Sequence, residues 1–120
     1  MNKIVVFVLI VILIIITGCT DSYEYTLNLR IYNETDKIKQ ISLLLYNSYD
    51  IELLNKSTSL EPNQLIKLSD ITHDIGSYTV IVTIDYNLTC LDENIRVGRD
   101  FGPVSIEVYD EEIKIFQQQN

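Results

Sequence analysis

Apolar and polar side chains alternate along most of the chain after residue 24. In the clearest stretch, Tyr78, Val80, Val82, Ile84 and Tyr86 occupy every second position. A period of two is typical of a strand with one buried face, because successive side chains point to opposite sides of a sheet. The pattern predicts eight strands, over residues 25–31, 41–45, 51–53, 66–68, 78–86, 95–97, 104–108 and 113–115.

Turn-forming residues separate these segments. Three polar loops have the length that hairpins use: Asn33-Glu34-Thr35-Asp36, Asn47-Ser48-Tyr49-Asp50 and Asp110-Glu111-Glu112. Glu61-Pro62-Asn63 and Gly102-Pro103 are expected to end strands, since proline cannot donate to a ladder. Neither an interdomain linker nor a repeat interrupts the pattern. We therefore expect one antiparallel all-β domain, a sandwich or barrel over residues 24–117, followed by a polar tail at 118–120.

The first 18 residues differ from the rest of the chain. Lys3 precedes an unbroken run of 13 apolar residues from Ile4 to Ile16, and small residues follow it. A charged start, a short apolar run and a small-residue exit are the three parts of a secretory signal. As a helix, 13 residues span about 20 Å, which is short of the roughly 30 Å of a bilayer core. An uncleaved transmembrane anchor is the alternative.

The sequence Ile16-Thr17-Gly18-Cys19 ends this segment. It resembles the lipobox of prokaryotic lipoproteins, in which the cysteine receives a diacylglyceryl group and becomes the new N-terminus. The resemblance implies a signal peptide at 1–18, a lipid on Cys19, a tether at 19–23, and residence on the extracytoplasmic face of the cell membrane. Two acyl chains suffice for stable anchoring. Without lipid, Cys19 could pair with Cys90 in an oxidising exterior.

A second motif narrows the expected fold. Asp74-Ile75-Gly76-Ser77-Tyr78-Thr79-Val80 resembles the Asp-x-Gly-x-Tyr-x-Cys signature of immunoglobulin domains, with valine in place of the cysteine. The resemblance implies an immunoglobulin- or fibronectin-like antiparallel β-sandwich of about seven or eight strands, with Asp74, Gly76 and Tyr78 forming a tyrosine corner. Three strands are predicted after Tyr86, so either residues 95–97 are loop or a hairpin is added. Lipobox, short spacer and Gly-x-Tyr-x-Val together are similar to uncharacterised archaeal surface lipoproteins.

The negative net charge of the chain limits the kinds of molecule that it can bind. The chain has 9 basic and 17 acidic residues, a net charge of −8, and loss of Lys3 with residues 1–18 leaves 8 against 17, or −9. Such a surface repels both nucleic acid and the anionic face of a membrane, so no nucleic-acid partner is expected.

Candidate chemistry is sparse. His73 is the single histidine, which argues against a zinc site or a His-dependent triad. Carboxylates occur in three clusters, interpreted as solvated loop charge: Asp70 with Asp74, Asp92 with Glu93, and Asp110 to Glu112. We expect no catalytic residues, metal or cofactor. Asn33, Asn55 and Asn87 begin possible N-glycosylation sequons.

These features predict a non-enzymatic interaction or structural module of the cell envelope, bound to the membrane by its lipid, with an envelope protein as partner. The alternative is a small envelope enzyme or ligand-binding accessory protein that uses loop carboxylates and tyrosines such as Tyr46 and Tyr49. A deep pocket with converging carboxylates would favour the alternative, whereas a featureless convex surface with an open sheet edge would favour the module, since sheet edges recruit partner strands.

Overall fold

The computed structural model describes residues 25–119, which consist of β-strands and loops. The strands are β1 (Leu29–Asn33), β2 (Lys39–Asn47), β3 (Glu52–Leu60), β4 (Leu65–Leu68), β5 (Gly76–Ile84), β6 (Leu88–Val97), β7 (Phe101–Val108) and β8 (Ile113–Gln119). Within these residues there is no helix of the length and apolarity needed to cross a bilayer. The prediction of an all-β domain with about eight strands is confirmed. The predicted signal peptide, Cys19 and the tether at 19–23 lie outside the described residues.

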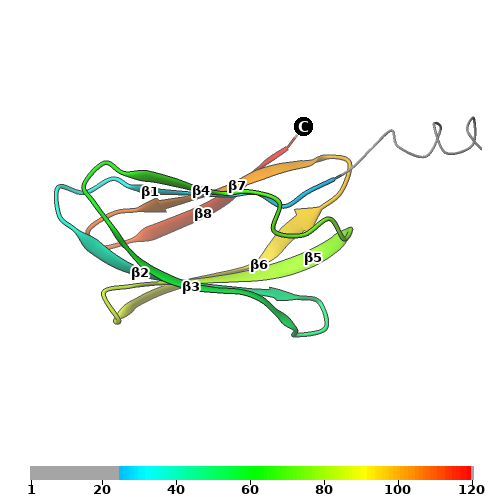
Figure 1. Cartoon of the computed structure of the whole chain (residues 1–120), viewed down its shortest axis with the longest axis horizontal. Helices are drawn as coiled ribbons and strands as arrows, with labels where there is room; N and C mark the ends of the chain where they lie inside the picture. Colours follow the sequence, from blue (N-terminus) through cyan, green and yellow to red (C-terminus); the bar gives the residue numbers. More distant parts are fainter. Residues whose placement is uncertain (1–24, 120) are drawn as a thin grey trace, which may run out of the picture.

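The strands form two four-stranded sheets that face each other as layers (Figure 1). One sheet has the order β4-β1-β7-β8, and the other has the order β3-β2-β5-β6. All neighbours are antiparallel except β1 and β7, which run parallel. The parallel pair places the C-terminal hairpin, β7–β8, beside the first strand of the domain.

The core lies between the two layers and follows the predicted alternation. In β5, Tyr78, Val80, Val82 and Ile84 are at most 3% exposed, while the residues between them are half-buried or exposed. β1, β2 and β7 follow the same pattern. Burial of each such aliphatic side chain contributes about 1.5–3 kcal/mol to the stability of the fold.

The two outermost strands of the second sheet are longer than predicted. β3 continues to Leu60 instead of ending at residue 53, and β6 begins at Leu88 instead of residue 95. Residues 95–97 are therefore strand, and the loop alternative for them is wrong. Both are edge strands with many exposed polar side chains, so the sequence alternation that reports one-sided burial is weak there.

Other boundaries also differ from the sequence prediction. β5 ends at Ile84 instead of residue 86, so Tyr86, which the alternation assigns to the buried side of the strand, lies in a turn and is 88% exposed. β1 begins at Leu29 instead of residue 25, although the amide of Leu27 still donates to the carbonyl of Thr72 at 2.9 Å. β8 extends to Gln119 and so includes most of the predicted polar tail. Gly102-Pro103 lies inside β7, at an irregularity in its register with β8, where a missing amide donor is tolerated.

Candidate functional site

The side chain of Asn33, which begins the first of the three sequons, joins several segments of the fold by hydrogen bonds. Its side chain is 0% exposed at the end of β1. Its amide nitrogen, Nδ2, donates to the carbonyls of Lys37, Leu60 and Glu61 at 2.9, 3.1 and 3.1 Å. Its Oδ1 accepts from the amide and the hydroxyl of Thr35 at 3.0 and 2.7 Å. A glycan on this nitrogen would displace a buried donor, so the folded domain has no place for one at Asn33.

The other two sequon residues lie on the surface. Asn55 is exposed in the edge strand β3, and Asn87 is exposed in the turn between β5 and β6. Neither side chain is buried, so both remain accessible positions for the predicted modification.

The tyrosine motif lies at the start of β5. Tyr78 is 3% exposed, and its hydroxyl donates a hydrogen bond to the backbone carbonyl of Asp74. Gly76 is the first residue of β5 and pairs with Val97 of β6. The bond therefore ties the loop that enters β5 to a core side chain.

The remaining candidate residues from the sequence do not converge. His73 is exposed, and its Nδ1 lies 3.1 Å from the carbonyl oxygen of Tyr25. Cys90 is half-buried in β6 opposite Val82. Within residues 25–119, no group of three His, Cys, Asp or Glu side chains is arranged to hold a metal ion.

Two groups of charged side chains lie at the end of the sandwich that contains the β5–β6 and β7–β8 turns. Lys39 is 8% exposed, and its Nζ lies 3.6 Å from Asp85 and 3.5 Å from Asp110, which links loops from both sheets. Partial burial of Tyr109 raises the pKa of its hydroxyl, and the carboxylates of Glu107 and Glu34 raise this pKa further. These contacts join loops of the two sheets at this end of the domain.

The outer side of the sheet β3-β2-β5-β6 contains two rows without an ionisable side chain. Each row crosses all four strands by cross-strand pairing. We call these eight residues the uncharged face: Ser57, Ser42, Thr83 and Thr89 in one row, and Asn55, Leu44, Ile81 and Leu91 in the other. Leu91 is 52% exposed, and Thr83 and Thr89 lie within hydrogen-bond distance at 3.1 Å. Covering a face of this composition costs less hydration free energy than covering ionised side chains, provided that its hydroxyl and amide groups find hydrogen-bond partners.

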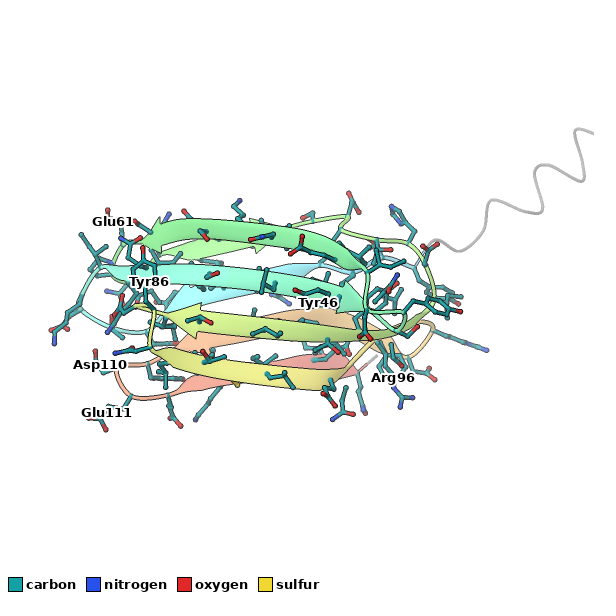
Figure 2. The ribbon with its side chains drawn as sticks, turned by 90° about the horizontal axis from the view of Figure 1, so that it is seen from below. Tyr46, Glu61, Tyr86, Arg96, Asp110 and Glu111 are labelled. Carbon is teal, nitrogen blue, oxygen red and sulfur yellow. The ribbon has the colours of Figure 1, made fainter. Side chains whose placement is uncertain are left out.

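Tyrosines border the uncharged face at both ends (Figure 2). Tyr86 is 88% exposed, in a turn where both Asp85 and Tyr86 have positive φ angles of 51° and 64°. Such φ values usually belong to glycine or asparagine, so a tyrosine there is uncommon. Tyr86 borders a small hollow of about 60 Å³ together with residues of β2, β3 and β5. Tyr46 lies toward the other end of the same sheet.

A larger hollow lies beside the tyrosine motif. It measures about 210 Å³ and is lined by the β2–β3 turn, which includes Tyr49, and by the segment from Asp74 to Tyr78. Tyr49 is 82% exposed. Of the two tyrosines that the sequence groups at one turn, this hollow includes Tyr49 only. Asp74 is the single carboxylate among its lining residues, so carboxylates do not converge there.

Sequence reasoning missed the uncharged face, although a signal for it exists. In β2 and β5 the residues that alternate with the core positions are Ser42, Leu44, Ile81 and Thr83, where a solvated sheet commonly has charges. The pattern was visible strand by strand. That these residues form one continuous face follows only from the strand order, in which β2 lies between β3 and β5.

Comparison with known proteins gives a likeness in fold alone. No protein-family model matches the sequence, and no curated protein matches it. Among solved structures, the chain is similar to the NMR structure of a protein from Eubacterium rectale, with 19% identity and a TM-score of 0.50. The match covers 84% of this chain and 95% of the other.

Proposed function

We propose that this protein is a non-enzymatic interaction module of the cell envelope, anchored through a lipid on Cys19 to the extracytoplasmic face of the membrane, that binds another protein through its uncharged face. The observation that carries the binding role is the pair of rows without ionisable side chains in a chain of net charge −8. Elsewhere, acidic loops favour hydration and repel other acidic surfaces. The uncharged face is where contact requires the least desolvation.

The size of this sheet is adequate for a specific contact. Four strands about 4.8 Å apart, each with about nine residues of 3.3 Å, cover roughly 20 by 30 Å, or about 600 Å², of which the two rows of the uncharged face occupy about 260 Å². A standard interface buries about 800 Å² on each partner, so the uncharged face would form the centre of the contact, and the rest of the sheet and the loops at its ends would supply the remaining area. Tyr86 and Tyr46 border the face, and tyrosine is enriched at interfaces.

We also propose that the sandwich is a relative of the immunoglobulin-like class. The hydrogen bond from Tyr78 to the Asp74 carbonyl supports this relation, because it joins a strand entry to a tyrosine two residues before a buried position, Val80. The parallel pairing of β1 with β7 departs from a seven-stranded immunoglobulin arrangement. The relation therefore requires an added hairpin, β7–β8.

The anchor is tested by intact mass and membrane partitioning in a lipoprotein-competent host. We expect a chain that begins at Cys19, carries a lipid-sized mass and partitions into membranes, and we expect Cys19→Ala to lose both the mass and the membrane binding. An unmodified chain that retains residues 1–18 would instead support a transmembrane tether. Cleavage without lipid would support a secreted domain with Cys19 available for Cys90.

The binding role is tested by site-specific photo-crosslinking in the producing cells. A crosslinking residue at Leu91, which is 52% exposed on the uncharged face, is compared with one at Leu65, which is 47% exposed on the opposite sheet. We expect a discrete protein adduct from position 91 and none from position 65, and we expect Ile81→Arg to abolish the adduct while far-UV circular dichroism stays unchanged. Equal labelling at both positions, or none at 91, would contradict the proposed surface.

A further inference from the structure

Two cations lie directly opposite each other on the sheet β4-β1-β7-β8. Arg30 of β1 is paired with Lys67 of β4 in the antiparallel register. Because its chain neighbours Leu29 and Ile31 are buried in the core, Arg30 is on the outer side of the sheet. Like charges at directly opposed positions destabilise a sheet. The chain has almost twice as many acidic as basic residues, so two basic residues placed directly opposite each other, with no acidic residue between them, call for an explanation.

No carboxylate of the described residues lies within 4.0 Å of the charged nitrogens of this pair. The ion pairs found within residues 25–119 belong to Lys39 and Lys114. Arg30 donates one long hydrogen bond, 3.4 Å, to the neutral side chain of Gln118. By contrast, Lys114 on the same side of the sheet lies 3.9 Å from Glu112 and 5.2 Å from the ring centroid of Tyr109. Arg30 and Lys67 therefore have donors available for a ligand.

The two cations line a hollow with further polar groups. It measures about 220 Å³ and is lined by Asn28, Leu29, Arg30, Lys67, Ser69 and Pro103. The Oδ1 of Asn28 already accepts from the amide of Asp70 at 2.9 Å, which leaves its Nδ2 as a donor. The volume equals that of about seven liquid waters at roughly 30 Å³ each, enough for an oxyanion and its substituent.

We infer that this hollow is a binding site for a phosphate group. Two positive charges match the charge of about −1.5 to −2 that a phosphate monoester carries at neutral pH, whereas one carboxylate would leave a cation uncompensated. The planar guanidinium of Arg30 can bond two phosphate oxygens at once, and Lys67 adds a point charge. Asn28 and Ser69 supply neutral donors from the rim. Asp70, beside the hollow, is not among its lining residues and accepts from the hydroxyl of Thr26 at 3.3 Å.

The phosphate could be a free phosphate or the headgroup of a lipid. The second source is within reach if the proposed anchor is present, because the nine residues from Cys19 to Asn28 span at most about 30 Å. The site itself does not depend on that anchor or on the uncharged face, which belongs to the other sheet. Its test can therefore fail while the proposed function holds.

The test is a titration followed by amide NMR shifts, with the full chain in a mild neutral detergent. Inorganic phosphate is the first probe, against sodium chloride at equal ionic strength. We expect saturable shifts at Asn28, Arg30, Lys67 and Ser69 that chloride does not produce. Arg30→Gln and Lys67→Gln should each raise the dissociation constant roughly tenfold, since a charge-assisted hydrogen bond is removed. Lys114→Gln, on the same side of the sheet, should leave it unchanged.

The second arm uses bilayer nanodiscs of phosphatidylcholine with or without one-fifth phosphatidic acid, whose headgroup is a phosphate monoester. Shifts at the same four residues with phosphatidic acid but not with inorganic phosphate would assign the site to a lipid headgroup, and shifts with both would assign it to phosphate in general. If neither probe exceeds its chloride or phosphatidylcholine control, the inference is wrong.

The melting temperature without phosphate distinguishes a binding role of Arg30 and Lys67 from a structural one. If the pair exists to bind phosphate, Arg30→Gln and Lys67→Gln relieve repulsion and leave the melting temperature equal or higher in chloride. At the same phosphate concentration, the same variants show a smaller increase in melting temperature than the unmodified chain. A lower melting temperature for both variants in chloride, with the response to phosphate retained, would overturn the inference.

Discussion

Replacement of Asn33 by alanine tests whether one buried amide holds together β1, the loop after it and the end of β3. Asn33→Ala removes the Nδ2 donor from the carbonyls of Lys37, Leu60 and Glu61, and the Oδ1 acceptor from Thr35. The bond to Leu60 is buried, whereas those to Lys37 and Glu61 are partly buried. Loss of a buried partner costs about 1–3 kcal/mol, and loss of partly hydrated ones costs less.

The expected total is a loss of about 3–5 kcal/mol in the free energy of unfolding, because five bonds share one side chain and their contributions are not additive. Domains of this size are stable by about 5–15 kcal/mol, so the variant should fold, but marginally. Asn33→Asp should lose at least as much, because it places an acceptor oxygen against the three carbonyls.

The measurement is urea unfolding, followed by circular dichroism and tyrosine fluorescence. With a denaturant slope of about 1.5 kcal/mol/M, the midpoint should fall by about 2–3 M. Asn55→Ala is the matched control, since Asn55 begins another sequon but is exposed, and it should change stability by no more than about 0.5 kcal/mol. A loss below about 1 kcal/mol for Asn33→Ala, equal to that of the control, would refute the assigned role of this side chain.

Three further perturbations address other parts of the domain. Tyr78→Phe removes the hydroxyl that donates to the Asp74 carbonyl and should lower the free energy of unfolding by about 0.5–1.5 kcal/mol in the same assay; no loss would mean that the corner does not stabilise the fold. Gln117→Ala removes the side-chain oxygen that accepts from the Arg96 amide at 2.9 Å and the nitrogen that donates to the Arg96 carbonyl at 2.6 Å, so hydrogen exchange at the Arg96 amide should accelerate, and unchanged exchange would count against this link between β6 and β8. Because the pKa of Tyr109 is raised in the folded state, its contribution to stability is present below its unfolded pKa of about 10 and is lost as pH rises through the folded value. Tyr109→Phe should reduce the loss of stability above pH about 10, and an absorbance titration at alkaline pH in which no tyrosine ionises late would contradict this.

Part of the candidate surface could be recognised from the sequence. The uncharged residues between the core positions of β2 and β5, such as Ser42 and Thr83, are visible as a pattern. The phosphate hollow could not be recognised, because Arg30 and Lys67 lie far apart in the chain and become neighbours only through β1–β4 pairing. The same holds for Asn33, whose sequence context of Glu, Thr and Asp is that of a polar surface turn, although the β3–β4 connection covers it.

Sequence alone determined the class of structure and the composition of its core. A period of two marks which side of a strand is buried, and that information is local, so Val80 and Val82 in β5 could be assigned to the core without coordinates. Tertiary structure decided the order of the strands, the parallel pairing of β1 with β7, and the lengths of the edge strands β3 and β6. These depend on contacts between residues distant in the chain and on burial at sheet edges, which alternation along one strand does not encode. Both proposed surfaces consist of such cross-strand neighbours, and so they are properties of the fold.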